Sequence, residues 1–390
     1  MADSLFSISS RTWPARQSRY RGLLYLLCMT LPAAAQTGTA GNPVVEVLAR
    51  GLEHPWALAF IDQGRMLVTE RPGRLRLVQR DGKLGAPIAG VPEVDAGGQG
   101  GLHDVVADSG FAENRTIYLC YAEPGAGGNS TALASARLSA DGTRLEQVKV
   151  LFSQRPKVRS SAHFGCRIVE TREGKLFLTL GDRFSRKEDA QTLNNHLGKI
   201  VHVKKDGGIP PDNPFADSDK PAGALPEIWS YGHRNIQGAA LGPDGKLWVV
   251  EHGPQGGDEL NRIEPGRNYG WPVITYGENY GGGKIGAGIT AKAGMEQPLH
   301  HWTPSIAPSG MVFLHSGKYG KDWQRNLLTG SLKFSYLARL ELRDGKVVRE
   351  EKLLQDLDRR IRDVREGPDG LLYILTDESR GQLIRLQPAS

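Results

Sequence analysis

The chain has 390 residues, of which 39% are hydrophobic and 24% charged, so it can bury a core and lacks the composition of a disordered chain. Its formal charge of +6, without a block of Lys or Arg, does not predict nucleic-acid binding. Three cysteines are too few for a disulfide scaffold, and no zinc-ligand spacing is present. The 49 glycines and 23 prolines favour many tight turns over long helices.

The N-terminal segment has the pattern of an export signal. Three arginines precede a short apolar run (22–32), and an Ala-x-Ala site (33–35) follows it. This pattern predicts a cleaved secretory signal peptide over residues 1–35, because the apolar run is shorter than the ~20 residues of a membrane span. An uncleaved anchor is the alternative. We expect a periplasmic or secreted mature protein without stable membrane insertion.

Beyond this segment, short apolar runs bounded by Gly, Pro, Asp and Asn predict strands. One pattern recurs, in which a glycine turn leads into an alternating strand with a polar or acidic end. Four clear copies and two degenerate ones occupy residues 64–70, 174–182, 245–251 and 370–377, and residues 115–121 and 325–330. Successive copies begin 45 to 80 residues apart, which suits four-stranded antiparallel blades with insertions. The sequence therefore predicts an all-β fold, a six-bladed β-propeller, in a single catalytic domain over residues 42–388. A pair of β-sandwiches and a β-helix are the alternatives, and the irregular spacing disfavours the β-helix.

Two segments fall outside the repeats. The strand predicted at 44–49 has no blade of its own, and we expect it to close the ring beside the strand at 382–386, which removes open sheet edges. The largest insertion, residues 269–309, is Gly-rich, and we expect it to cap the face of the ring at its axis.

A histidine and an aspartate flank the third repeat. His163 precedes its strand and Asp182 ends it, so a hairpin in this blade would bring the two side chains to the same end. A carboxylate there orients an imidazole and raises its basicity, as a general base requires. A structural or solvated histidine is the alternative.

Further polar residues follow or precede other repeats. Arg234 and Asn235 offer a fork of donors and an amide, which suit carboxylates or quinone oxygens; a turn with a surface arginine is the alternative. Arg360 and Arg362 are two residues apart on a predicted strand, so both side chains point toward the same anion, and Lys333 is placed to join them. Solvated arginines paired with Asp363 are the alternative.

The segment 251–259 combines glycine and proline, which expose backbone carbonyls, with two carboxylates at its end. Hard oxygen ligands of this kind suit Ca²⁺, although the spacing is not that of an EF-hand loop.

Taken together, these residues make the chain recognisable. From about residue 44 to 387 it resembles the soluble quinoprotein sugar dehydrogenases, and most closely the PQQ-dependent aldose sugar dehydrogenases. The resemblance rests on strings that fall in order along the chain, at residues 51–60, 98–102, 163–165, 226–232, 251–254, 256–259, 268–272 and 360–365.

The resemblance implies a six-bladed propeller with PQQ on its axis face, where a base removes the proton of the sugar's anomeric hydroxyl. It implies that His163 is this base, that Asp182 is its acidic partner and that Arg234 also belongs to the catalytic group. The implied PQQ contacts are Gln99, Arg234, Asn235, Thr275, Tyr276, Gly277, Glu278, Asn279, Tyr280, Lys333, Arg360 and Arg362. Gly253 and Pro254 match backbone ligands of a Ca²⁺ that polarises PQQ, and Glu259 and Tyr269 match a second Ca²⁺ site.

Two features depart from the family pattern. Cys166 stands where the family pattern has a small glycine; we interpret it as a packing residue, with a Cys120–Cys166 pair as the alternative. The basic segment 183–188 is unusual beside a pocket for neutral sugars, and it indicates acidic or phosphorylated sugars as further candidates.

The sequence thus predicts a periplasmic oxidoreductase that oxidises aldoses at C1 to lactones and passes electrons to an external quinone, cytochrome or dye. The alternatives are a propeller lactonase or other hydrolase with one axial metal, and a non-enzymatic sugar-binding propeller. A cluster of Arg and Lys at the axis discriminates against the hydrolase.

Overall fold

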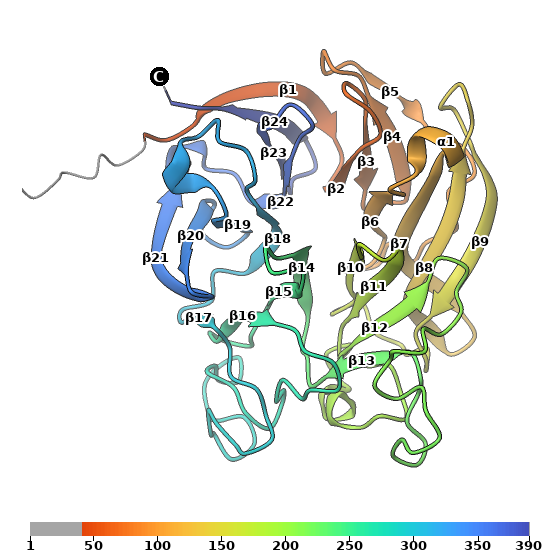
Figure 1. Cartoon of the computed structure of the whole chain (residues 1–390), viewed down its shortest axis with the longest axis vertical. Helices are drawn as coiled ribbons and strands as arrows, with labels where there is room; N and C mark the ends of the chain where they lie inside the picture. The colour runs from red at the N-terminus through yellow and green to blue at the C-terminus, as the bar shows by residue number, and fades with distance from the viewer. Residues whose placement is uncertain (1–40, 390) are drawn as a thin grey trace, which may run out of the picture. The chain divides into compact units, whose positions relative to one another are not determined.

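The computed structural model describes residues 41–389, which form six four-stranded sheets around a common axis (Figure 1). Strands pair antiparallel in every sheet, as the repeats predicted. The predicted six-bladed β-propeller is therefore confirmed. The signal peptide expected at residues 1–35 lies outside the described residues. Within residues 41–389, no helix has the length and apolar character needed to cross a bilayer.

The strand nearest the axis in each blade comes first, and neighbouring blades contact one another through these innermost strands. They are β2 (Pro55–Phe60), β6 (Leu102–Ala107), β10 (Gly165–Glu170), β14 (Ile236–Leu241), β18 (Pro308–Phe313) and β22 (Ile361–Glu366). The second strands are β3 (Met66–Glu70), β7 (Thr116–Gly125), β11 (Lys175–Leu180), β15 (Leu247–Glu251), β19 (Leu327–Ser331) and β23 (Leu372–Thr376). All six predicted repeats fall on these second strands, so the repeated strand lies one position out from the axis.

The outer half of each blade is more exposed. Its third strands are β4 (Arg74–Val78), β8 (Gly128–Leu138), β12 (Lys199–Lys204), β16 (Asp258–Arg262), β20 (Leu337–Arg343) and β24 (Gly381–Gln387). The outermost strands are β5 (Leu84–Pro87), β9 (Leu145–Ser153), β13 (Ile228–Tyr231), β17 (His300–Trp302), β21 (Lys346–Leu353) and β1 (Val44–Leu52). Helical turns are short: α1 (Phe111–Asn114), η1 (Lys187–Gln191), η2 (Lys321–Trp323) and η3 (Gln355–Leu357).

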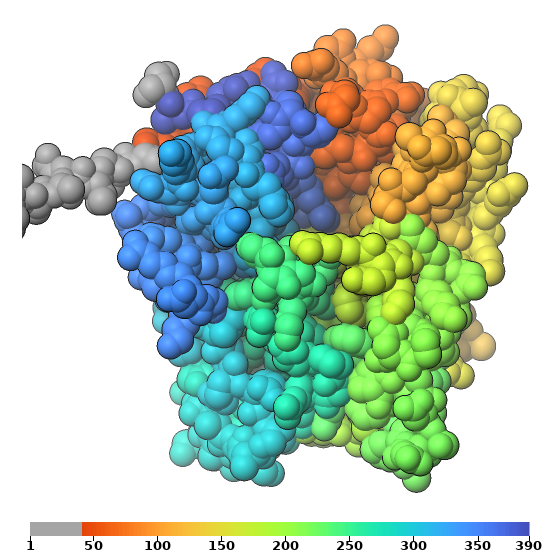
Figure 2. Space-filling model, viewed as in Figure 1, coloured from red at the N-terminus to blue at the C-terminus, as the bar shows by residue number. Residues whose placement is uncertain are grey.

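The ring closes where the two ends of the propeller meet. β1 pairs antiparallel with β24, with Val45 opposite Leu386, so the first strand completes the last blade. In the space-filling view the blue C-terminal blade lies directly against the red and orange N-terminal segment (Figure 2). The closure expected from the sequence is confirmed, and it pairs the sheet edges that both ends would otherwise expose.

Local chemistry explains the hairpins. In the third blade the turn between β10 and β11 ends at Gly174, whose φ of 73° lies in the left-handed region that glycine tolerates. The following strand KLFLTL is buried from its second residue onward, because both of its faces pack against neighbouring sheets.

Charged residues are buried among the innermost strands. Arg167 on β10 is 1% exposed, and its Nη1 lies 3.1 Å from Asp363 Oδ1 and 3.5 Å from Asp104 Oδ1. Arg365 pairs with the same two carboxylates, at 3.0 Å and 3.1 Å. Two cations and two anions therefore join β6, β10 and β22, and each buried charge has an opposite partner.

Candidate active site

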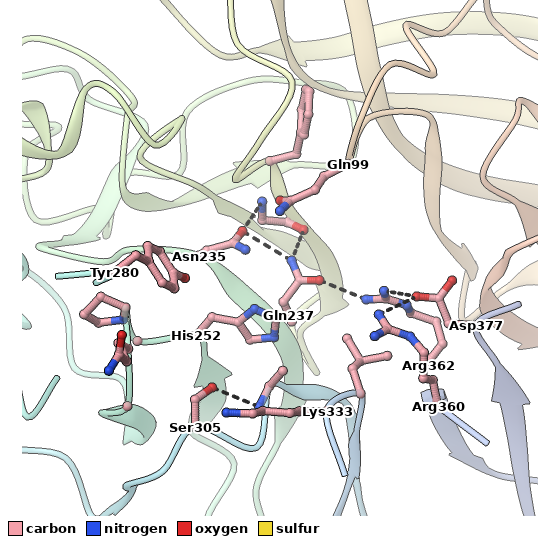
Figure 3. Close-up of a pocket in the computed structure, with 18 of the residues that line it drawn as sticks. Gln99, Asn235, Gln237, His252, Tyr280, Ser305, Lys333, Arg360, Arg362 and Asp377 are labelled. Atoms are coloured by element: carbon pink, nitrogen blue, oxygen red, sulfur yellow. Dashed lines mark hydrogen bonds and ion pairs between the residues drawn. The ribbon is translucent and has the colours of Figure 1, made fainter. Parts of the chain in front are cut away.

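A cavity of about 1310 Å³ opens at the end of the ring where the innermost strands begin (Figure 3). It receives residues from every blade. The insertion 269–309 supplies part of its wall through Tyr276, Glu278, Tyr280 and the segment 303–307.

Bulges in the innermost strands aim side chains into this cavity. The pairing of each innermost strand with its neighbour shifts register near its start, so extra residues are left unpaired there. In four blades a residue at this shift lines the cavity: Trp56, His103, Gln237 and Arg362. The same β-bulge, repeated in four blades, thus directs these four side chains into the cavity, where we call them the cavity floor.

One end of the cavity carries cations. Arg360 and Arg362 both pair with Asp377, with Arg360 Nη2 at 3.4 Å from its Oδ2, and Figure 3 shows the three side chains together. Arg362 Nη1 also donates to Gln237 Oε1 at 3.1 Å, while its buried Nε has no partner among the described residues. Lys333 lines the same cavity and forms no ion pair with the described residues. All three cations predicted to face one site line this cavity, and the carboxylate that pairs with the two arginines is Asp377 and not Asp363.

Amide and imidazole groups line the rest of the wall. Asn235 Oδ1 accepts hydrogen bonds from Gly165 N at 3.1 Å and from Gln237 Nε2 at 3.3 Å. The Nδ2 group of Asn235 takes part in neither of these hydrogen bonds. His103 and His252 are buried, which lowers the pKa of each to about 3 and keeps both neutral. His103 Nδ1 is buried without a partner among the described residues.

His163 and Asp182 are in direct contact beside this wall. His163 Nδ1 lies 2.7 Å from Asp182 Oδ1, as the predicted hairpin of β10 and β11 requires. Asp182 Oδ2 accepts a hydrogen bond from Trp271 Nε1 at 2.7 Å. The backbone N–H of His163 donates to Oε1 of Gln99, a wall residue, at 2.9 Å. Because Nδ1–H donates to the carboxylate, the lone pair of the imidazole lies on Nε2, which forms no hydrogen bond to the described residues.

The backbone around His163 is unusual. Its φ of 53° lies in the left-handed region, which a residue with a Cβ adopts only when its surroundings impose it. Gly181 provides part of this restraint, because a Cβ there would lie 2.0 Å from the His163 carbonyl oxygen. Burial lowers the pKa of His163, and the hydrogen bond to Asp182 opposes this shift. His163 is therefore held neutral and in a fixed orientation.

Arg234 lies close to the His163–Asp182 pair without lining the cavity. Its Nη1 donates to the carbonyls of Gly253 at 2.6 Å and His252 at 3.1 Å, and its Nη2 lies 3.3 Å from the Tyr280 hydroxyl. Its guanidinium also stacks 5.3 Å from the Trp271 ring.

The predicted contact loop 275–280 only partly faces the cavity. Tyr276, Glu278 and Tyr280 line it, whereas Thr275, Gly277 and Asn279 do not. Thr275 Oγ1 accepts from the Gly277 N–H within the loop, and Asn279 Nδ2 donates to the Lys284 carbonyl. Every second residue of the loop therefore contributes to the lining of the cavity.

The four predicted metal ligands lie in two separate parts of the structure. Gly253 and Pro254 line the cavity, while Glu259 and Tyr269 lie in the fourth blade near Glu251. Burial and the neighbouring Glu251 raise the pKa of Glu259 to about 8, and the buried Asn261 Oδ1 beside it has no hydrogen-bond donor within the described part of the chain. Among residues 41–389, no group of three or more His, Cys, Asp and Glu side chains is arranged to hold a metal ion.

One interpretation of the sequence is wrong, and another loses part of its support. Cys166 is not merely a packing residue, because it forms a disulfide with Cys120 on β7, and Cα–Cα is 5.7 Å. Arg183 does not face a sugar, because its side chain is buried and donates to the carbonyls of Asn129 and Ala162. The side chain of Arg183 therefore gives no support for a charged sugar as the substrate.

Several residues of the site were not singled out from the sequence. Trp56 and His252 lie within strings that carried the family resemblance, and Asp377 ends a repeat as Asp182 does. The place of these three residues in the strings and in the repeat could have identified them from the sequence. Trp271 also lies within one of these strings, at residues 268–272. Arg71, His103 and Gln237 had no such signal, since their approach to the site depends on bulges and on contacts between blades.

The comparisons with known proteins agree with this geometry. Residues 52–385 match the family described as Glucose / Sorbosone dehydrogenase. The chain is 45% identical over 377 residues to the aldose sugar dehydrogenase YliI of Escherichia coli (strain K12), covering 96% of this chain and 99% of that protein. The apo crystal structure of the soluble aldose sugar dehydrogenase from Escherichia coli matches with a TM-score of 0.84 and 46% identity, covering 89% of this chain and 99% of that one. The PQQ-bound aldose sugar dehydrogenase of Streptomyces coelicolor matches with a TM-score of 0.72 and 25% identity, covering 89% and 99%. These similarities favour the dehydrogenase over the hydrolase and the sugar-binding propeller.

Proposed function

The chain belongs to the glucose/sorbosone dehydrogenase family, and from this premise we propose that it oxidises aldose sugars at C1 to lactones with PQQ as cofactor and His163 as base. Its membership makes it an enzyme of the oxidoreductase class. The observation that carries the proposal is the pair His163–Asp182 beside a cavity lined by Lys333, Arg360 and Arg362.

The residues of the cavity fit PQQ, which carries three carboxylates. Arg362 has a buried N–H without a partner, and Lys333 has an ammonium without an ion pair, among the described residues. A bound carboxylate supplies both with acceptors, in charge-assisted hydrogen bonds. Asn235 and Gln99 offer amide groups to the quinone oxygens. When bound, PQQ accepts the hydride that leaves the sugar carbon.

The protein's own part of the reaction is proton transfer. His163 Nε2 accepts the proton of the anomeric hydroxyl, while Nδ1–H keeps its hydrogen bond to Asp182. Asp182 stabilises the imidazolium that forms and holds the ring in one tautomer. The anomeric hydroxyl oxygen loses this proton and C1 loses a hydride, so the C1–OH of the sugar ring becomes the C1=O of a lactone.

Calcium is part of the proposal. The Gly253 and Pro254 carbonyls are hard oxygen ligands in the cavity wall, and a Ca²⁺ held there would polarise the quinone oxygens. Too few protein ligands are present for Ca²⁺ alone, so we expect the cofactor to complete its coordination. The neighbouring carboxyl groups of Glu251 and Glu259, with an Asn261 oxygen that has no partner among residues 41–389, support a second Ca²⁺ together with Tyr269.

We further propose that the protein acts in the periplasm, after cleavage of residues 1–35, and passes electrons to an external acceptor such as a quinone or a cytochrome. The Cys120–Cys166 disulfide supports an oxidising compartment, where such bonds persist.

The test is dye-linked activity of the purified mature protein with a panel of aldoses, with PQQ and Ca²⁺ added together and each omitted. We expect activity only with both, and its loss in His163→Ala while PQQ still binds. His315→Ala, which changes an exposed histidine paired with Glu366, is the matched control. A folded protein that shows neither activity nor a spectral change with PQQ would contradict the proposal.

A further inference from the structure

The ring of Phe184 stands exposed beside the proposed base. It is 53% exposed, and its centroid lies 5.2 Å from the His163 ring with the planes at 81°. Packing does not explain this placement, because more than half of the side chain remains in water. The residue belongs to the loop that follows β11, between Asp182 and η1.

The backbone that carries this ring is strained. Arg183 has a φ of 59° and Phe184 a φ of 63°, so two consecutive residues with side chains occupy the left-handed region. Such conformations persist only where the surroundings impose them, and they concentrate at functional sites. An exposed aromatic residue on a strained backbone stabilises the fold neither by packing nor by conformation.

Specific contacts impose this conformation. Asp182 Oδ1, which accepts from His163, also accepts from the Phe184 N–H at 2.8 Å. The Ser160 hydroxyl donates to the Arg183 carbonyl at 2.9 Å, and the buried Arg183 guanidinium stacks 3.8 Å from the Phe164 ring. One carboxylate therefore positions both the base and the aromatic ring.

The cationic side chains nearby already have hydrogen-bond or ion-pair partners. The donors of Arg183 are bound to backbone and amide oxygens, and Arg186 pairs with Asp189. Arg234 donates to two carbonyls. These donors are therefore already used within the protein, and the exposed group next to the base is the apolar ring of Phe184, which favours a neutral sugar ring.

We propose that Phe184 is the platform on which the C–H face of an aldopyranose lies, which places the anomeric hydroxyl at His163 Nε2. A pyranose with equatorial hydroxyls presents an apolar face of C–H bonds, and an aromatic ring is its natural partner. This inference rests on the proposed function and assigns to Phe184 the selection of neutral ring-form sugars.

The test compares Phe184→Ala, Phe184→Gly and Phe184→Tyr with the wild-type holoenzyme on D-glucose and D-xylose. For Ala and Gly we expect a KM about three- to tenfold higher with kcat nearly unchanged, and for Tyr a KM close to that of the wild type. Phe184→Gly should also keep or raise the midpoint of thermal unfolding, because glycine relieves the left-handed strain. Val348→Ala, an exposed apolar change on the outermost strand β21, is the control and should leave KM unchanged.

A second readout does not depend on turnover. The probe is 1,5-anhydroglucitol, which has the pyranose ring but no anomeric hydroxyl to oxidise, and saturation-transfer NMR detects its ring protons against the protein. We expect its signal to weaken in Phe184→Ala. Unchanged KM and an unchanged NMR signal in that variant overturn the platform even if the enzyme is active. If no aldose is oxidised with PQQ, the proposed function fails, and the NMR comparison still decides the role of Phe184.

Discussion

The indole N–H of Trp271 donates to Asp182 Oδ2 at 2.7 Å across 89 residues of sequence. The other oxygen of the same carboxylate accepts from His163 Nδ1, so Trp271 reaches the base through Asp182. Trp271 comes from the long insertion of the fourth blade, whereas His163 and Asp182 belong to the third. The orientation of the base thus depends on a contact between blades.

Trp271→Phe removes this donor and keeps an aromatic ring. The carboxylate then retains more negative charge toward His163, so we expect the pKa of His163 to rise and the acid limb of the kcat/KM profile to move to higher pH. Lost orientation should lower kcat/KM by about five- to tenfold at neutral pH. Trp302→Phe, which loses an equivalent bond to Glu350, is the control and should leave the profile in place. A Trp271→Phe profile that coincides with the wild type would show that the bond is only structural.

Asp182→Asn shifts the same profile in the opposite direction. Burial lowers the pKa of His163 below the usual range of histidine, and Asp182 partly counteracts that effect. The wild-type base is therefore neutral at pH 7, and its activity should fall only in acid. In Asp182→Asn the carboxylate charge that raises the pKa of His163 is gone. That pKa therefore falls, and the acid limb of the kcat/KM profile moves to lower pH. The amide also permits the wrong tautomer, and kcat should fall by roughly a thousandfold or more. Parallel pH–rate profiles of the two variants, with PQQ titrations as the control for folding, check this prediction.

Arg360→Ala, Arg362→Ala and Lys333→Ala should each weaken PQQ binding. In the proposed binding mode each removes a charge-assisted hydrogen bond to a carboxylate of PQQ, and we expect a rise in Kd of about ten- to hundredfold. Titration of the purified variants with PQQ by calorimetry measures this. Arg359→Ala changes a neighbouring arginine that pairs with Glu378 and does not line the cavity, so it should leave Kd unchanged. Equal losses for Arg359 and Arg362 would indicate a general effect of charge and no specific contact.

The disulfide should stabilise the fold because it limits the conformational freedom of the unfolded chain. Cys120 and Cys166 are 46 residues apart, and closing a loop of that size contributes about 4 kcal/mol in the chain-entropy description. The double variant Cys120→Ala/Cys166→Ala should therefore unfold at a clearly lower urea concentration. A reductant should lower the wild-type midpoint and leave that of the double variant unchanged. Coincident unfolding curves for oxidised wild type and the double variant would contradict the stabilising role.

Much of the fold and part of the site follow from local patterns. The alternating strands with glycine turns predicted the second strand of all six blades, because alternation and turn chemistry are written in consecutive residues. The His163–Asp182 contact follows in the same way, since a hairpin brings the start of one strand to the end of the next. Arg360 and Arg362 were singled out together from strand alternation, and both pair with Asp377, although Arg360 precedes β22 and Arg362 lies at its bulge.

Other features were decided only when the blades packed together. Trp56, His103, Gln237 and Arg362 enter the cavity at β-bulges, where strict alternation breaks down and the neighbouring strand determines which residue is left unpaired. Cys166 meets Cys120, and Trp271 meets Asp182, across separate blades. The amino-acid sequence by itself determined the strands and the contact between His163 and Asp182, since these depend on consecutive residues and on one hairpin. It also indicated the closure of the ring, because the first strand has no blade of its own. The tertiary structure alone decided the cavity floor, the disulfide and the ring of Phe184, because contacts between distant segments impose their geometry.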